Sequence, residues 1–437
     1  MKVVQADWVC PVATAPIRNG FVVIDGGKIV DVGLTAPDGV PVESFAGCAL
    51  LPGFVNVHTH LELTILRGFL ENLPFATWIR RLTRTKYEHL SRDELLLSAR
   101  LGAMECLRAG VTTIGEVMDI GTGWEAMTEF GLRGVAYQEV FGPSEEAAGS
   151  AARGLEQKLK AFRMTESDTR RIGVSPHAVY SVSSALFGLV RNLAERESVR
   201  VAIHVAESRD ENRFVRSGEG PFADYWRSRE IPVVARGESP IEYLNRLGMI
   251  GPETLAIHAI HADAGDVAIL RDCGSGVAHC PKSNMKLGHQ TAPVRGFVKA
   301  GVPVGLGTDS VASNNVVDMF EEMRTALFLQ RTLSGRQDSM VAHQVLRMAT
   351  LDAARCLGMD SRVGSLEPGK LADMTVVDLN DPALQPVYDP VETLVYSAGR
   401  KNVKATLLAG EPVTVDPTSL IREAQSVAER LKSVSFE

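Results

Sequence analysis

The sequence has few cysteines, no long apolar run and no basic segment, and each of these absences excludes a class of protein. Its six cysteines are scattered over 437 residues without a C-x-x-C pair, which indicates neither a disulfide framework nor a thiolate metal site. No apolar run approaches the roughly 20 residues of a membrane span, and the first residues lack a signal-peptide pattern. We therefore expect a cytoplasmic protein that does not bind membranes.

Positive charge is also scarce. The formal net charge is -7, and no segment is dense in Lys and Arg, whereas a protein that binds nucleic acid usually carries a basic patch. The composition, 45% hydrophobic and 23% charged, is otherwise that of an ordinary globular protein. The expected partner is therefore a small molecule and not a nucleic acid, and assembly into a homo-oligomer stays an open alternative.

Short runs rich in Val, Ile and Ala alternate with longer amphipathic stretches through the middle of the chain. This alternation is typical of a parallel sheet whose crossovers are helices. Eight such runs occur: "GFVNVHTH", "VTTIGEV", "GVAYQEV", "IGVSPHAVY", "VRVAIHVAES", "TLAIHAIH", "GVAHCPKSN" and "PVGLGTDS". Among the connecting segments, "SRDELLLSARLGAMECLRAG" offers Ser91 as a helix N-cap, Glu94 three residues on and Gly110 as a stop. The pattern predicts an α/β fold, a (β/α)8 TIM-like barrel over residues 53–358.

The two ends of the chain have a different character. Residues 1–52 contain "GFVVIDGGKIVDVG", two alternating runs around a Gly-Gly turn, which predicts a hairpin. Residues 359–437 contain three more strand-like runs, "LADMTVVDLN", "TLVYSAG" and "VKATLLAGEPV". We therefore predict that both ends form one small, discontinuous β-sandwich-like domain. The second part also includes a C-terminal helix after Asp416, with one apolar face formed by Leu420, Ala424, Val427, Leu431 and Val434.

Seven of the ten histidines fall in or at the end of the predicted barrel strands: His58, His60, His177, His204, His258, His261 and His279. Strand ends of a barrel converge on one mouth, and residues i and i+2 of a strand point the same way. With Asp309 of "GLGTDS", the set His58, His60 and His204 therefore predicts a site for Zn2+ or another borderline divalent ion. For any single histidine the alternative is a hydrogen-bonded core residue, and for His261 and His279 both interpretations stay open.

These motifs resemble those of the amidohydrolase superfamily, in particular its cytosine deaminase-like branch, which includes adenosine, S-adenosylhomocysteine, guanine and aminofutalosine deaminases. The resemblance runs through "LPGFVNVHTH", "RGFLENLP", "AGVTTIGEVMD", "SPHAVYSVS", "HVAES", "AHCPKSNMKLG", "GLGTDSVASNN" and "GSLEPGKLADMTVVD". It implies that Glu207 is the carboxylate that carries protons, that His258 contacts the attacking water and that His177 contacts the substrate. It also implies that the metal is held by His58, His60, His204 and Asp309.

The number of metal ions follows from a missing residue. Binuclear members of this superfamily carry a carboxylated lysine after the fourth strand, but "IGVSPHAVYSVS" has none. We therefore expect one divalent ion per chain, with Zn2+ preferred and Fe2+ as the alternative. Such an ion lowers the pKa of its water toward about 7. Asp309 is then expected to take the proton of that water, and Glu207 to carry protons to the ring and to the departing amine. The alternative for Glu207 is a solvated loop acid.

Further substrate contacts are predicted outside the metal site. The segment 61–88 is rich in large apolar residues, including Trp78, and can build a pocket wall for a planar heterocycle, or else pack as a loop helix or subunit interface. Glu62 in "HLEL" departs from the S-adenosylhomocysteine deaminases and looks like the aminofutalosine deaminases. Lys282 in "AHCPKSNMKLG" is predicted to meet an anionic group at the far end of the substrate, with a solvated loop lysine as the alternative.

Together these features predict a metal-dependent hydrolytic deaminase of an aminated N-heterocycle that releases ammonia. The expected substrate is a purine base, a nucleoside or a nucleoside-like metabolite such as an adenosine derivative or aminofutalosine. An alternative within enzymes is the removal of chloride or an alkylamine from a triazine. A different class is a catalytically dead scaffold, which predicts eroded ligands, although the four ligands and Glu207 are all present.

Overall fold

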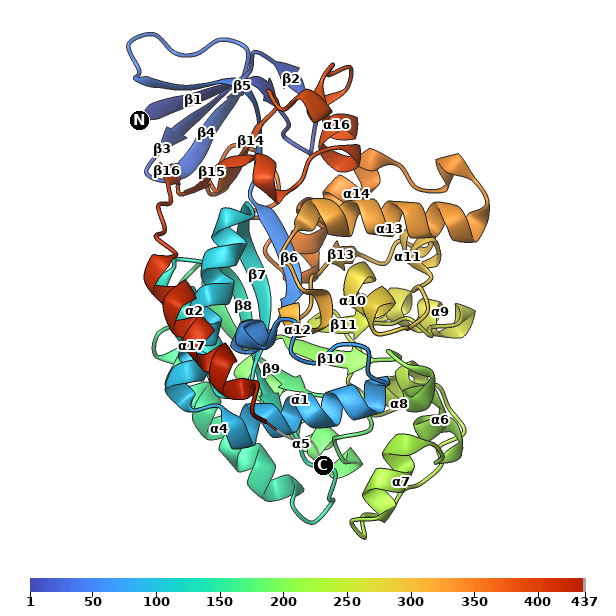
Figure 1. The fold of residues 1–437 in the computed structure, drawn as a ribbon. Helices are drawn as coiled ribbons and strands as arrows, with labels where there is room; N and C mark the ends of the chain where they lie inside the picture. Colours follow the sequence, from blue (N-terminus) through green and yellow to red (C-terminus); the bar gives the residue numbers. More distant parts are fainter. Residues whose placement is uncertain (435–437) are drawn as a thin grey trace.

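A computed structural model describes residues 1–434 and shows a parallel barrel with a second sheet at one end (Figure 1). The barrel strands pair in sequence order, and each overlaps one of the eight predicted runs, which confirms the (β/α)8 fold. They are β6 (Phe54–Thr59), β7 (Val111–Met118), β8 (Arg133–Val140), β9 (Arg170–Pro176), β10 (Val201–Val205), β11 (Thr254–His258), β12 (Gly276–His279) and β13 (Val304–Leu306).

Helices connect the barrel strands. The predicted helix after Ser91 is confirmed: the Ser91 hydroxyl accepts from the Glu94 amide, the Glu94 carboxylate accepts from the Ser91 amide, and Gly110 follows at φ +82°. No helix in residues 1–434 is both long and apolar enough to cross a membrane. The helical segments before β14 are η1 (Leu61–Leu66), α1 (Phe75–His89), α2 (Arg92–Arg108), α3 (Thr122–Glu129), α4 (Ala148–Arg163), α5 (Ser184–Glu197), α6 (Arg209–Ser217), α7 (Pro221–Arg227), α8 (Pro240–Arg246), α9 (Ala264–Asp272), α10 (Pro281–Lys286), α11 (Val294–Ala300), α12 (Val311–Asn314), α13 (Met319–Ser334), η2 (Gln337–Ser339), α14 (Ala342–Met348) and α15 (Leu351–Cys356).

The first and last barrel strands, β6 and β13, are joined by hydrogen bonds just beyond the short strand β13. The Asp309 amide donates to the His58 carbonyl oxygen over 2.9 Å. The buried Asn56 amide makes two more bonds: its Nδ2 donates to the Thr308 hydroxyl at 2.8 Å, and its Oδ1 accepts from the Thr308 amide at 2.9 Å. The seam of the barrel is therefore closed beside two of the predicted metal ligands.

The second sheet uses both ends of the chain, as predicted. Its order is β16-β15-β14-β5-β1-β3-β4, with β2 paired to β1, so these strands form one sheet and not the two layers of a sandwich. The predicted hairpin is β3–β4, which turns at Gly26 and Gly27 with φ of 54° and 76°. The strands are β1 (Lys2–Val9), β2 (Ile17–Arg18), β3 (Phe21–Asp25), β4 (Lys28–Gly33), β5 (Val42–Pro52), β14 (Met374–Asp378), β15 (Val403–Leu408) and β16 (Glu411–Pro412).

One predicted strand is wrong. The run "TLVYSAG" lies mostly in the helix α16 (Pro390–Tyr396), between the short segments η3 (Pro382–Leu384) and η4 (Arg400–Asn402). The Asp389 carboxylate accepts from the amides of Val391 and Glu392, and Pro390 occupies the first helical position. This capping pattern, a preceding Asp and an initial Pro, starts a helix whatever the β-propensity of the apolar residues that follow.

The C-terminal helix α17 (Thr418–Leu431) packs on the barrel and not on the second sheet. It lies against α2 and η1 (Figure 1). Val427 and Leu431 are buried, and the other predicted members of the apolar face pack partly buried against the same cluster. The predicted face is confirmed, although Val434 lies past the end of the helix. The predicted domain division assigned this helix to the β domain, although its contacts are with α2 and η1 of the barrel.

The bonds at the barrel seam give a first test. Asn56→Ala leaves the buried Thr308 amide and hydroxyl without their partner, which we expect to lower the free energy of unfolding by about 1–3 kcal/mol. Denaturant titration monitored by circular dichroism measures the change. Asn192→Ala, at an exposed position on α5, is the control and should stay close to the unchanged protein. Equal stability of the two variants would contradict a structural role for the seam.

Candidate active site

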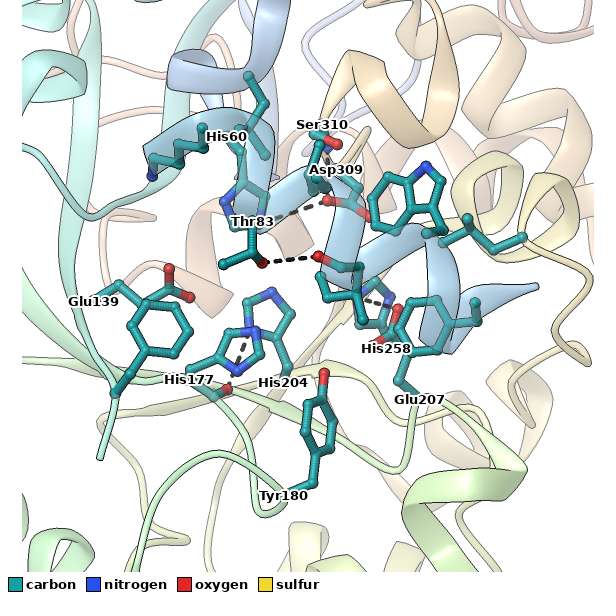
Figure 2. A pocket seen from close by; sticks show the side chains of 18 of the residues that line it. His60, Thr83, Glu139, His177, Tyr180, His204, Glu207, His258, Asp309 and Ser310 are labelled. Carbon is teal, nitrogen blue, oxygen red and sulfur yellow. Dashed lines mark hydrogen bonds and ion pairs between the residues drawn. The ribbon is translucent and has the colours of Figure 1, made fainter. Parts of the chain in front are cut away.

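The four predicted metal ligands come together at the carboxyl ends of the barrel strands. Nε2 of His58 and of His60 lie 3.4 Å and 3.6 Å from Oδ1 of Asp309. One ligand atom each of His58, His60 and His204 lies within 4.8 Å of the other two. Figure 2 shows His60 and Asp309 on one side of the cavity, with the His204 ring facing them from β10.

The chemistry of these donors fits a divalent ion. Both ring nitrogens of His58 are buried and have no hydrogen-bond partner among residues 1–434. Nδ1 of His204 lies 3.2 Å from the His177 carbonyl oxygen, which can only accept, so Nε2 of His204 is left for another partner. Burial lowers the pKa of His60 to about 3 and the pKa of His204 well below its usual value. Imidazoles beside one carboxylate form a donor set that zinc-like ions prefer.

Hydroxyl groups hold the Asp309 carboxylate. Its Oδ2 accepts from the hydroxyls of Ser283 at 2.6 Å and Ser313 at 3.0 Å, while the Ser310 amide donates to Oδ1 at 2.6 Å. Burial alone raises the pKa of Asp309, but the neighbouring imidazole of His58 and the nearby His258 and His60 hold it well below its usual value. The carboxylate is therefore ionised, and Oδ1 is the oxygen that faces the histidines.

A second carboxyl group lies across the cavity from the metal ligands. Oε1 of the buried Glu207 is 3.6 Å from Nε2 of His258 and 3.8 Å from Nε2 of His289. Burial raises the pKa of Glu207 well above its usual value, and the charges of Asp309 and Glu211 act in the same direction. A carboxyl group of this kind holds a proton near neutral pH and can both give and take one.

The side chain of Asn284 orients the imidazole of His258. Its Nδ1 lies 3.0 Å from Oδ1 of Asn284, which accepts a hydrogen bond, so Nε2 faces Glu207 without a proton. Burial lowers the pKa of His258 to about 3. Asn284 lies on α10, in the quoted motif "AHCPKSNMKLG", but the sequence did not indicate its partner. The ring is therefore neutral and fixed in one orientation.

The backbone at the strand ends is in an uncommon conformation. Ala206, His258 and Asp309, which follow or end three different barrel strands, have φ of 52°, 71° and 58°. Residues other than glycine adopt this left-handed region at a cost of about 1–3 kcal/mol each, and such residues concentrate at functional sites. The turns direct the side chains of His258 and Asp309 into one cavity.

The cavity has a volume of about 100 Å³ and an apolar wall from α1. Trp78 and His177, both predicted to contact the substrate, are among the lining residues. The contacts themselves stay predictions. Nδ1 of His177 lies 2.6 Å from the Ser181 hydroxyl, which fixes the ring. The apolar part of the lining is formed mainly by Leu63, Phe75, Trp78, Ile79, Leu82 and Leu287.

Two predicted substrate contacts need correction. The Glu62 side chain is 1% exposed, and its carboxylate accepts hydrogen bonds from the amides of residues 119–122 and from Nζ of Lys86 at 2.8 Å. It therefore has no face toward a substrate. The Lys282 ammonium pairs with the Glu321 carboxylate on α13 and does not line the cavity. Neither partner could be identified from the sequence, because Glu62 and Lys86 are 24 residues apart and Lys282 and Glu321 are 39 residues apart, beyond the spacing that periodicity relates.

Two of the remaining histidines lie outside the cavity lining. His279 is buried in β12, and burial lowers its pKa to about 3. His261 is half-buried just beyond β11. His289 is not among the lining residues either, but its Nε2 lies 3.8 Å from Oε1 of Glu207. It follows α10 in a loop, where the strand-end pattern predicts no site residue.

Sequence reasoning also missed two ionisable residues at the other end of the cavity. Lys86 and Glu139 both line it, and Figure 2 shows Glu139 on the side opposite Glu207. Burial raises the pKa of Glu139 to about 8, against the opposing effect of the Lys86 charge. Glu139 is the second-last residue of β8, so the strand-end rule that selected the histidines could have found it.

Comparisons with known proteins agree with this geometry. The profile described as "Amidohydrolase family" matches residues 49–413. The chain is 34% identical to a 5-methylthioadenosine/S-adenosylhomocysteine deaminase of Desulforudis audaxviator, over 97% of each chain. It is 31% identical to a 5'-deoxyadenosine deaminase of Methanosarcina mazei, over 95% of this chain and 94% of the relative. A crystal structure of an adenosine deaminase from Xanthomonas campestris with bound zinc superposes with a TM-score of 0.86 at 28% identity, covering 99% and 98%.

Metal content tests the ligand set. His58, His60 and His204 form one group of candidate donors and Asp309 lies beside the first two, so we expect about one tightly held divalent ion per chain by elemental analysis. His60→Ala removes one donor and should lower the retained metal, whereas His343→Ala, at an exposed position on α14, should not. Two equivalents of metal, or equal retention by both variants, would contradict the assignment.

Proposed function

The chain belongs to the amidohydrolase family, and we propose that it is a hydrolytic deaminase of adenosine derivatives that releases ammonia. The observation that carries the proposal is the position of Glu207, a buried carboxyl group that faces the same cavity as a cluster of metal donors. The named relatives act on adenosine-type nucleosides, which supports this substrate class.

His58, His60, His204 and Asp309 would hold a divalent ion, Zn2+ in our proposal with Fe2+ as the alternative, which would make a water molecule nucleophilic at neutral pH. Asp309 is ionised and can take a proton from the attacking water with Oδ1. His258 presents an unprotonated Nε2 to the same region and can orient that water. Glu207 gives its proton to the ring nitrogen beside the attacked carbon, then takes the proton of the new hydroxyl group and gives it to the departing amine. The proton held by Asp309 afterwards restores Glu207 to its protonated form.

The walls of the cavity suit a flat ring. Phe75 and Trp78 lie nearly parallel, with centroids 6.2 Å apart and planes at 16°, and Leu82 completes the same side. An adenine ring placed against this wall has its apolar faces removed from water, while its polar edge meets Glu207 and the histidines. The arrangement supports a purine as the reacting part of the substrate.

The alternatives predict different products. A triazine hydrolase with the same metal chemistry releases chloride or an alkylamine, and a scaffold releases nothing. The test is a screen of the metal-loaded protein for ammonia and chloride against adenosine, 5'-methylthioadenosine, S-adenosylhomocysteine, 5'-deoxyadenosine and a chlorotriazine. Ammonia from the nucleosides is the expected result. Release of chloride alone, or no turnover with metal bound, would overturn the proposal.

Substitution of Glu207 tests its role as proton carrier. Glu207→Gln keeps the shape of the side chain but cannot exchange a proton, so we expect kcat to fall by about 10²-fold or more while the metal content is unchanged. Glu219→Gln, at an exposed site after α6, is the control and should keep full activity. Loss of metal from Glu207→Gln would instead identify Glu207 as a ligand.

A further inference from the structure

A separate cavity, of about 500 Å³, lies on the outside of the barrel, where α17 packs against α2 (Figure 1). Its lining comes from the end of η1, the second half of α2, η4 and the start of α17. Among residues 1–434, this cavity and the active-site cavity have no lining residue in common. A ligand held there would therefore be bound apart from the metal site.

Positive charge dominates the lining, although the chain as a whole has a net charge of -7. Four cations line the cavity beside a single carboxylate, Glu105, namely Arg67, Arg108, Arg400 and Lys401. A second carboxylate, that of Asp381, lies outside the lining and pairs with Nζ of Lys401 at 3.1 Å. The four cations thus exceed these two carboxylates by two charges, and a concave surface with such an excess attracts anions.

The Glu105 carboxylate holds two of the arginines in place. Its Oε1 accepts from Nη1 of Arg67 at 3.2 Å and from Nη1 of Arg400 at 2.7 Å. Nη1 of Arg67 also donates to the Asn315 carbonyl oxygen at 2.8 Å. The Glu105 side chain is 11% exposed, whereas those of Arg67 and Arg400 are 33% and 44% exposed. Because a guanidinium has five N–H donors, both arginines keep donors for a ligand while their positions are already fixed.

The third arginine, Arg108, is unpaired. It lies in the last turn of α2 and is exposed, and within residues 1–434 its side chain has no hydrogen bond or ion pair. Its removal would therefore break no contact of the folded protein. Its planar guanidinium is suited to bidentate contact with a phosphate group.

The rest of the lining is apolar. It is formed by Leu101, Met104, Ala109, Pro417 and Ile421. Met104 is buried, but Ile421 remains 50% exposed on the first turn of α17. A volume of about 500 Å³ is in the range of pockets for small organic molecules and is larger than an inorganic anion needs. The ligand that fits has an anionic group and an apolar body.

We propose that this cavity binds a small molecule that carries a phosphate group on an apolar body. A phosphate ester has a charge of about -1.5 to -2 at pH 7, which matches the excess of two positive charges. Arg67, Arg108 and Arg400 supply its hydrogen-bond donors, and the apolar body contacts the wall formed by α2 and α17. The site is independent of the proposed function, because none of its residues takes part in the deamination.

Phenyl phosphate, inorganic phosphate and phenol test the two parts of the proposed ligand separately. In calorimetric titration of the metal-loaded protein, we expect phenyl phosphate to bind more tightly than inorganic phosphate, and phenol to show no measurable binding. Arg108→Gln should weaken the binding of phenyl phosphate by about tenfold, because it removes a charge-assisted hydrogen bond, and Arg108→Lys should restore part of the loss. Arg153→Gln, at an exposed position on α4, is the matched control.

The apolar wall is tested by Ile421→Ala, which should reduce the preference for phenyl phosphate over inorganic phosphate. Phosphate bound at the metal site would not respond to either substitution. Equal affinity of Arg108→Gln and Arg153→Gln for phenyl phosphate would therefore overturn the proposal, and so would equal affinity of the unchanged protein for phenyl phosphate and inorganic phosphate. These titrations do not depend on ammonia release, so their outcome is separate from that of the deaminase proposal.

Discussion

The hydrogen bond from the Asp309 amide to the His58 carbonyl oxygen joins the last strand of the barrel to the first. Both residues belong to the proposed metal site, so the contact that closes the barrel also sets the spacing of two ligands. The Asn56 side chain, bonded twice to Thr308, holds the same seam from one layer below. Loss of these hydrogen bonds would therefore lower both the stability of the barrel and its affinity for the metal, because the barrel strands themselves position the ligands.

The wall of the cavity is fixed to the metal site by a second polar contact. Glu62 lies two residues after His60, and its buried carboxylate binds Lys86 of α1 as well as the amides that follow β7. Although burial opposes it, the charge of Lys86 holds the pKa of Glu62 at about 2. The residue therefore acts on the cavity indirectly, by fixing the position of the helix that carries Trp78. This explains why a polar residue follows the histidine pair without facing the cavity.

The sequence supported prediction where local rules decide the structure. Strand periodicity located the eight strands, and the convergence of strand ends in a barrel was enough to select His58, His60, His204 and Asp309. It failed where distant segments decide. The partners that remove Glu62 and Lys282 from the cavity lie 24 and 39 residues further along the chain. The error at α16 was local instead: the Asp389 cap and Pro390 outweighed the β-propensity of the apolar residues that follow. His289 enters from a loop that carries no periodic signal.

The order of strands in the second sheet affects how the chain is completed during synthesis. β5 leads through Gly53 directly into β6, while its neighbour β14 is more than 300 residues further along the chain. Throughout translation of the barrel, one long edge of β5 therefore has no partner, and unpaired edges of this kind readily join other chains. We therefore expect the free edge of β5 to be the part of the second sheet most exposed to aggregation on the ribosome, until β14 has emerged.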